Sequence, residues 1–314
     1  MTYIIRRFIL LFVTLIFISV ITFLVFQILP GDPVRTILGP EAEEVQVETL
    51  RRQMGLDKPA HVQYLNLVQG FFQGDMGDSI RFSRPVTSLI MERLPITISL
   101  AMFSLIIVIF VAIPLGIFTA RRENKWSDFL LSSFTQLGMA IPTFFVGMML
   151  ILFIGMTFSF FSTGGYVPWS ESVAGAIGSL ALPALTIALP QIAISFRYAR
   201  NAILEQSKLD YVRTARGKGL TEAVVVYKHV LKNSMIPVLT VFGLILAEVI
   251  AGTIVVEQVF SLPGIGRLLI TAVSYRDFPV VQGIVLYIAF VVVLINFIVD
   301  ILYTVLDPRI RLKE

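Results

Sequence analysis

Charged side chains are scarce in this sequence. Only 15% of its 314 residues are Asp, Glu, Lys or Arg, whereas 56% are apolar and the mean hydropathy is +0.84. A soluble chain of this length keeps far more charge on its surface, so the composition indicates a membrane protein. Cysteine is absent, which excludes disulfides. The two histidines, His61 and His229, lie in separate polar segments without clustered carboxylates, so no metal site is expected.

Motifs for nucleotide or hydrolytic chemistry are also missing. Lys218 follows Gly217, but Val212 occupies the place of the first glycine of a phosphate-binding loop, and Gly219 stands where Ser or Thr is needed. No metalloprotease or serine-hydrolase pattern occurs. The chain is therefore predicted not to be an enzyme and to hold no cofactor itself. Its net charge of +4 requires no nucleic-acid partner.

Six long apolar stretches are present instead. A helix needs about 20 apolar residues to cross the hydrocarbon core of a bilayer, where only helices and closed barrels satisfy their backbone. The first stretch is too long for the core of a signal peptide and lacks a small-residue cleavage site after it, so it is expected to remain as a helix. The pattern predicts an all-α integral membrane protein with spans over Phe8–Leu29, Ile96–Thr119, Gln136–Phe160, Leu180–Phe196, Ile236–Val256 and Val280–Thr304.

Lys and Arg indicate the direction of the spans, because cytoplasmic loops carry an excess of these residues. With a cytoplasmic N-terminus, 16 of the 25 lie inside, and both termini are then cytoplasmic. This topology divides the chain into four parts. They are a first transmembrane helix (1–30), an extracytoplasmic cap (31–95), a five-helix core (96–304) that includes a cytoplasmic loop (197–235), and a cytoplasmic tail (305–314).

The cytoplasmic loop is predicted to contain two short helices. The first is expected from about Ala202 to Arg216, where apolar residues recur at helical spacing. Gly217 and Gly219 end it, and Thr221 is placed to cap the second helix. A short amphipathic helix below the membrane is a surface that a soluble partner can grip. Periodicity alone is equally consistent with a plain basic loop, or with a helix that lies on lipid headgroups and binds no partner.

The sequence of this loop resembles the cytoplasmic signature of bacterial ABC-importer permeases, and most closely that of the dipeptide, oligopeptide and nickel subfamily. Of the general pattern Glu-Ala-Ala, three residues, Gly, only Ala215 and Gly219 are kept, as in the subfamily's own version. Similar motifs follow in order along nearly the whole chain. They are Pro30-Gly31-Asp32-Pro33, Gly55-Leu56-Asp57-Lys58-Pro59, Gly74-Asp75-Met76-Gly77-Asp78-Ser79, the stretch Val256–Gly266, Arg276-Asp277 and Asp307-Pro308-Arg309-Ile310-Arg311.

The resemblance implies the type I ABC-importer permease fold and a channel-forming function. The subunit would translocate di- or oligopeptides, or a related solute such as a nickel chelate, another metallophore or a glycoside, across a bacterial or archaeal plasma membrane by alternating access. Its expected partners are a homologous second permease, two ATPase subunits that hold ATP and Mg²⁺, and an extracytoplasmic solute-binding protein.

The resemblance also implies two contact sites. The coupling helix, which sits in a groove of the ATPase subunit, falls on Asp210, Tyr211, Val212, Arg213, Thr214, Ala215, Arg216, Gly217, Lys218, Gly219 and Leu220. Docking of the binding protein is expected at Gly74, Asp75, Pro263, Gly264, Arg276 and Asp277.

Two polar residues within the spans are candidates for the solute pathway. Glu248 lies mid-span, where a charge costs at least a few kcal/mol and has to face protein or water. Gln191 follows Pro190 in the fourth span, which predicts either a bend along the pathway or a tolerated kink. Glu248 has a structural alternative too, as a protonated or paired carboxyl between helices. The small residues Gly243, Ala247 and Ala251 lie four apart and predict close helix packing, either against a partner permease or, as favoured here, within the chain.

Two other functions stay open at this point. A transporter driven by an ion gradient predicts intramembrane charge pairs and inverted repeats, but the spans hold one mid-span carboxylate and no clear repeat. An intramembrane enzyme needs a nucleophile or metal motif, and none is recognisable.

Overall fold

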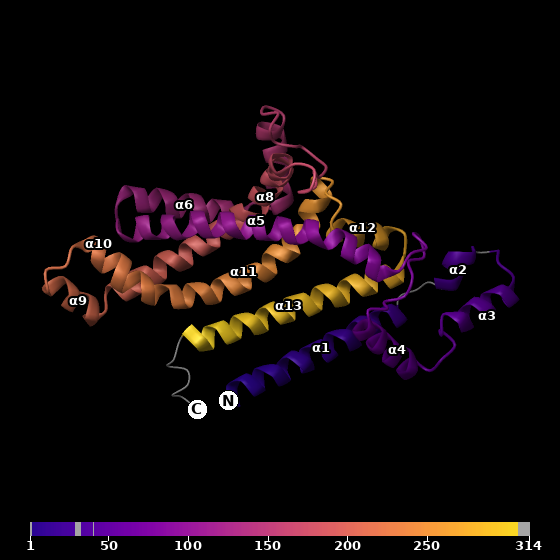
Figure 1. The fold of residues 1–314 in the computed structure, drawn as a ribbon. Helices are drawn as coiled ribbons and strands as arrows, with labels where there is room; N and C mark the ends of the chain where they lie inside the picture. The colour runs from indigo at the N-terminus through magenta and orange to yellow at the C-terminus, as the bar shows by residue number, and fades with distance from the viewer. Residues whose placement is uncertain (1, 29–32, 40, 307–314) are drawn as a thin grey trace. The chain divides into compact units, whose positions relative to one another are not determined.

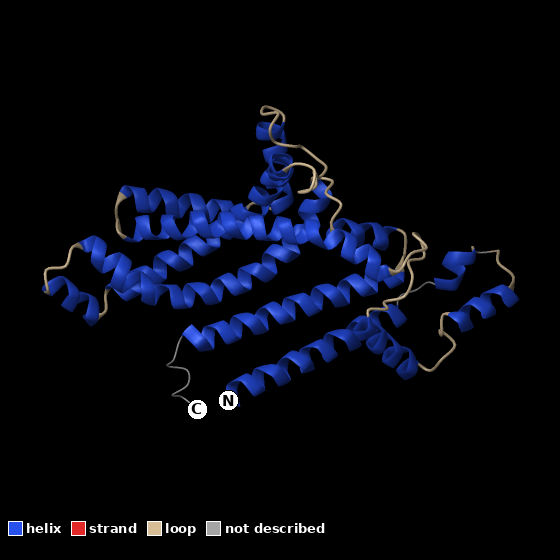
Figure 2. Cartoon of the chain, in the orientation of Figure 1, coloured by secondary structure: helices blue, strands red, loops and turns tan. Residues whose placement is uncertain are grey.

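A computed structural model describes residues 2–28, 33–39 and 41–306. In this part of the chain all regular secondary structure is helical (Figure 2), which confirms the predicted all-α class. The helices belong to two compact units, one of residues 1–95 and 264–294 and one of residues 96–263 and 295–314. The motif residues Pro30–Asp32 and Asp307–Arg311 lie outside the described residues. The predicted tail (305–314) also lies outside them, except for its first two residues, which end a helix at Leu306.

The first unit is built around the beginning of a long helix. Its elements are α1 (Thr2–Ile28), α2 (Pro33–Leu38), α3 (Glu44–Gln53), α4 (Ala60–Gln73), the start of α5 (Val86–Ala120), α12 (Ile265–Ser274) and the first part of α13 (Phe278–Leu306) (Figure 1). Val86, Leu89 and Ile90 of α5 are buried against apolar residues of α12 and α13. This packing fixes the start of α5 ten residues before the predicted second span.

The second unit is organised around a central helix. Its elements are the rest of α5, α6 (Trp126–Ala140), α7 (Thr143–Leu150), the π-helical η1 (Ile151–Gly155), α8 (Val173–Ser207), α9 (Asp210–Gly217), α10 (Glu222–Val224), the π-helical η2 (Val225–Val230), α11 (Leu231–Val259) and the end of α13. Helix α8 packs against α6, α7 and α11, and over half of its most apolar window is buried. Pro183 and Pro190 both lie inside it.

Within the described residues, five helices are long and apolar enough to cross a membrane. A sixth span is present only if α6 and α7 with η1 count as one span. The prediction of one uninterrupted stretch over Gln136–Phe160 is therefore wrong, because α6 and α7 meet at an angle of 104°. The break falls at Ile141-Pro142. Proline has no N–H to continue the helix and disfavours helical backbone in the residue before it, and Ile141 is extended (φ −88°, ψ 126°).

The first helix of the loop 197–235 is also interrupted. Helix α8 continues to Ser207 and α9 begins at Asp210, so a single helix from Ala202 to Arg216 is wrong. Leu209 between them is extended (φ −76°, ψ 153°). The predicted end is confirmed, since α9 ends at Gly217 and Gly219 has φ +77°. Thr221 precedes α10 as predicted, but its side chain makes no capping hydrogen bond.

Gly243 confirms close packing within the chain. A Cβ atom added to Gly243 would lie 2.3 Å from Val299 Cγ1, so only glycine allows α11 and the end of α13 to approach this closely. Ala251, two turns further along α11, is exposed and does not share this contact.

Candidate functional site

Helix α9 is attached to its own subunit by one apolar face. Val212 and Ala215 are buried in a cluster with Ile117 of α5, Ile203 of α8 and residues of η2. Residues three apart lie on the same side of a helix, so these two side chains orient the whole of α9. Within the predicted coupling segment, Val212 and Ala215 therefore attach the helix to its own subunit, because side chains buried in this way cannot contact another protein.

The opposite face of α9 is open. The other nine residues of the predicted coupling segment are exposed, among them Tyr211, Arg213 and Lys218. The Tyr211 hydroxyl donates a hydrogen bond to Gln206 Oε1 (2.9 Å), which fixes the ring beside the end of α8. The segment thus presents an aromatic ring and several cations on a rigid helix beyond the ends of α8 and α11 (Figure 1).

The turn that follows α9 is closed by an ion pair. Arg216 donates from Nε to Glu222 Oε2 (3.1 Å) and from Nη2 to Glu222 Oε1 (2.8 Å), so the two planar groups meet edge to edge. These hydrogen bonds raise the pKa of the Arg216 guanidinium. The pair spans the turn that contains Gly219 and joins the start of α10 to the end of α9.

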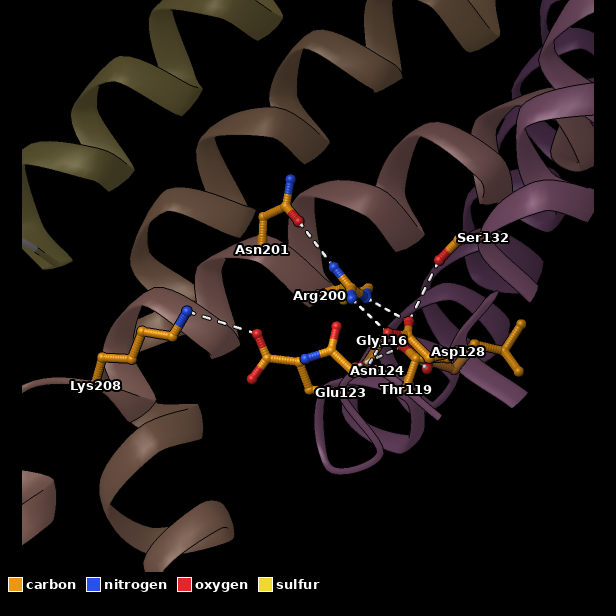
Figure 3. A network of polar contacts seen from close by, with 10 residues as sticks. Gly116, Thr119, Glu123, Asn124, Asp128, Ser132, Arg200, Asn201 and Lys208 are labelled. Atoms are coloured by element: carbon orange, nitrogen blue, oxygen red, sulfur yellow. Dashed lines mark hydrogen bonds and ion pairs between the residues drawn. The ribbon is translucent and has the colours of Figure 1, made fainter. Parts of the chain in front are cut away.

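A second, better-buried ion pair fixes the end of α8 just before α9 (Figure 3). Arg200 of α8 donates from Nε to Asp128 Oδ1 (2.7 Å) and from Nη2 to Asp128 Oδ2 (2.6 Å). The side chains are only 20% and 6% exposed, respectively. Asp128, in the first turn of α6, also accepts from the backbone N–H of Asn124 (3.2 Å) and from the Ser132 hydroxyl (3.4 Å). We call this set the Asp128–Arg200 clamp.

Close backbone contact accompanies the clamp. A Cβ atom on Gly116 of α5 would lie 2.9 Å from Ala199 Cβ and 3.2 Å from the backbone nitrogen of Arg200. Lys208, in the link between α8 and α9, lies 3.6 Å from Glu123 in the turn before α6. The end of α8 is thus held to α5 and α6 before the chain enters α9.

Sequence reasoning missed Asp128. Its partner Arg200 lies 72 residues later in the chain. One signal was available: a lone carboxylate in an otherwise uncharged helix needs a cation or several donors. The residue's position in the first turn of α6, near the positive end of the helix dipole, fits the same requirement.

Asp277 has a structural environment in the first unit. Its carboxylate is fully buried and accepts hydrogen bonds from the Ser79 hydroxyl (2.6 Å), the backbone N–H of Ile80 (3.1 Å) and the backbone N–H of Arg81 (3.2 Å). We call this set the Asp277 clasp. A carboxylate enclosed in this way cannot touch a docking protein, so the expectation for Asp277 itself has to be corrected.

The remaining residues of the predicted docking set differ in accessibility. Gly74 is exposed with φ +78° at the end of α4, and Asp75 and Pro263 are exposed as well. Arg276 is exposed with φ +55°, while Gly264 is buried. Arg81 lies over the ring of Tyr275, 3.2 Å from its centroid. Docking at the accessible positions stays a prediction.

The two pathway candidates have contrasting surroundings. Glu248 is exposed in the middle of α11. Gln191 of α8 is half-buried, and its Oε1 atom is buried without a hydrogen-bond partner. Among the described residues no group of three or more His, Cys, Asp or Glu is placed to hold a metal ion.

Comparison with known proteins agrees with this picture. Residues 112–312 match the family model described as binding-protein-dependent transport system inner membrane component. Residues 1–101 match the model of the N-terminal part of the same membrane component. The two matches together cover nearly the whole chain.

Relatives of similar length are known from several bacteria. A Brucella abortus (strain 2308) protein, whose name contains the words "peptide transport system permease protein", is 42% identical over 297 residues, which is 95% of either chain. The glutathione transport system permease protein GsiC of Salmonella typhimurium is 38% identical over 313 residues and the full length of both chains. The oligopeptide transport system permease protein AppB of Bacillus subtilis is 38% identical over 312 residues, 98% of this chain and 99% of its own.

Proposed function

This chain belongs to the family of binding-protein-dependent transport system inner membrane components, the permease subunits of ABC importers, and from this premise we propose that its cargo is a peptide. The names of three relatives that cover the chain nearly end to end refer to peptides, oligopeptides or glutathione, itself a tripeptide, and these names support the proposal. The chain forms the membrane channel of the importer. Nickel chelates, other metallophores and glycosides are the alternatives.

The coupling segment Asp210–Leu220 is the contact for the ATPase subunits in this proposal. The observation that carries it is the two-sided character of α9. Val212 and Ala215 fasten one face to the subunit, while the other face presents Tyr211 and a row of cations to the outside. ATP and Mg²⁺ are held by two ATPase subunits. These lie beneath this permease and a second, homologous permease.

Transport proceeds by alternating access. Closure of the ATPase pair moves α9, and the rigid attachment of α9 passes the motion to α5, α6 and α8 through the Asp128–Arg200 clamp. Closely packed helix bundles switch between discrete arrangements, so a small shift at α9 suffices to change which side is open. With α9 and both termini in the cytoplasm, the distribution of Lys and Arg agrees with the positive-inside rule. The binding protein docks on the opposite side, at Gly74, Asp75, Pro263 and Arg276.

Substitution of Gly219 tests the coupling role. A Cβ atom added there meets no heavy atom within 4 Å, so Asp fits without a clash, although φ +77° costs it about 1 kcal/mol. Gly219→Asp places a negative charge beside the cations of α9. We expect peptide uptake by membrane vesicles of the complete transporter to fall at least about ten-fold, with the subunit still present at normal levels.

A matched control separates charge at the interface from backbone strain. Gly165 has a similar φ of +83° and equally open surroundings in a different loop of the same unit, so Gly165→Asp should leave uptake within about two-fold. Normal uptake by Gly219→Asp counts against a coupling role for this segment. Absence of peptide uptake by the unmodified transporter counts against the cargo assignment instead.

A further inference from the structure

Glu248 stands out as a charged side chain on an uncovered helix face. It lies in the middle of α11, and no described residue forms a hydrogen bond or ion pair with it. A carboxylate at this depth is costly in contact with lipid, so water, another protein or a ligand has to face it. The exposed residues of α11 that share its side of the helix are Asn233, Pro237, Leu244, Ala251, Val255 and Gln258.

Two polar atoms of α8 lack partners as well. Gln191 Oε1 and Ser195 Oγ are buried and form no hydrogen bond within the described part of the chain. The two residues are four apart, so they lie on the same face of α8, one turn from each other. A buried polar atom without a partner costs about 1–3 kcal/mol, and two on one face indicate that a donor is missing there.

Glu248 and Gln191 lie at the same depth, and Ser195 lies one turn further along α8. A Cβ atom on Gly252 of α11 would lie 3.6 Å from Ile187 Cγ2 of α8, so the helices meet at this level. Helix α8 leads into α9, and α11 leads out of the same end (Figure 1), so the two run in opposite directions. Four residues from Ile187 toward that end lies Gln191 on α8, and four residues from Gly252 toward the same end lies Glu248 on α11. Both steps correspond to about 6 Å along the helix axis.

From this arrangement we infer that Glu248, Gln191 and Ser195 form a mid-membrane site for a protonated amine, and that its ligand is the α-amino group of the peptide. The inference rests on the proposed function and extends it to the chemistry of recognition. An ammonium group has three N–H donors and no acceptor. The site offers a carboxylate, an amide oxygen and a hydroxyl oxygen, and the carboxylate balances the charge.

Other occupants fit the same atoms less well. A divalent ion such as Ca²⁺ takes six to eight oxygen ligands and usually more than one carboxylate, whereas this site has one. A basic side chain of the second permease would also pair with Glu248, and the experiment distinguishes it from the cargo.

The absence of cysteine from the chain permits a direct test. Leu244→Cys places a thiol one turn from Glu248 on its exposed side. The complete transporter, with partner subunits free of reactive thiols, is placed in lipid nanodiscs and treated with cationic or anionic methanethiosulfonate reagents. We expect faster reaction with the cation, and a fall of at least about ten-fold in the cation-to-anion rate ratio when Glu248→Gln is added. Alanyl-alanine should slow the labelling, and N-acetyl-alanyl-alanine should not.

Two further variants sharpen the result. Leu239→Cys is the control, because Leu239 is exposed on the opposite side of α11 and its thiol should react with neither charged reagent. Gln191→Leu removes one acceptor but no charge, so it should weaken protection by alanyl-alanine several-fold and leave the rate ratio unchanged.

Each of four results would overturn the inference. In the first, Leu244→Cys reacts only with membrane-permeant apolar reagents. In the second, its thiol reacts in the isolated chain but not in the assembled transporter. In the third, the preference for the cationic reagent survives Glu248→Gln, and in the fourth, both peptides protect the thiol equally. The second result would assign Glu248 to the contact with the other permease. Peptide uptake by the unmodified transporter is measured separately, so a failure here leaves the proposed function standing.

Discussion

Two buried aspartates fasten this chain in different ways. In the Asp128–Arg200 clamp of the second unit, a guanidinium neutralises the carboxylate and grips both of its oxygens. In the Asp277 clasp of the first unit, the carboxylate is stabilised by one hydroxyl and two backbone N–H groups, with no ion pair from the described residues. The clamp is partly open to solvent through Arg200, whereas the Asp277 carboxylate is fully enclosed.

The comparison indicates that the two buried aspartates have different roles in the two units. The clamp holds the last part of α8, the helix that leads into α9, and this part has to move if coupling works as proposed. The clasp closes a turn between α12 and α13 onto the loop before α5, and Arg276 in that turn has φ +55°. We therefore expect changes at Asp277 to act chiefly on stability, and changes at Asp128 or Arg200 to act on both stability and transport.

The largest loss of stability is expected for Asp277→Ala. The substitution leaves the Ser79 hydroxyl and the N–H groups of Ile80 and Arg81 without their acceptor, at about 1 kcal/mol or more for each group. Thermal unfolding of the purified subunit in detergent should therefore show a decrease of roughly 3 kcal/mol in stability. Asp75→Ala is the control, because Asp75 is exposed and, among the described residues, its carboxylate accepts a single hydrogen bond, from the backbone N–H of Gly77. Equal stability of the two variants would contradict the clasp.

An intermediate effect is expected at the clamp, where a double-mutant cycle is informative. Asp128→Ala leaves the Arg200 guanidinium without its carboxylate, at about 2 kcal/mol after allowance for its partial exposure. The double variant Asp128→Ala, Arg200→Ala should be less destabilised than the sum of the single variants, by about 1–2 kcal/mol. Both single variants should reduce peptide uptake. Additive effects on stability would show that the pair contributes no coupling of its own.

The smallest effect is expected for the pair Arg216–Glu222, whose side chains are 43% and 51% exposed. Solvent screens such a pair, so Arg216→Gln should change the stability of the subunit by less than about 1 kcal/mol. The same thermal measurement checks this. A loss as large as that of Asp128→Ala would remove the distinction between buried and exposed pairs on which the comparison depends.

Long-range contacts explain most of what sequence reasoning missed. The pairing of Asp128 with Arg200 and of Asp277 with Ser79 joins residues 72 and 198 positions apart, and no local pattern marks such partners. The break before Pro142 was readable from the proline itself, but the apolar run on both sides of it concealed the change of direction. The interruption at Lys208-Leu209 is marked by neither glycine nor proline, and beyond it Val212 and Ala215 are buried against α5, α8 and η2.

The sequence by itself determined the class of the molecule, the approximate positions of its spans and the segment that carries the coupling motif. Runs of apolar residues and the placement of Lys and Arg are local quantities, and the bilayer acts on each segment separately. Tertiary structure alone decided which polar side chains are enclosed, which are exposed and which lack partners. Burial depends on segments brought together from distant parts of the chain, as the enclosure of Gln191 Oε1 and Ser195 Oγ without a hydrogen-bond partner among the described residues shows.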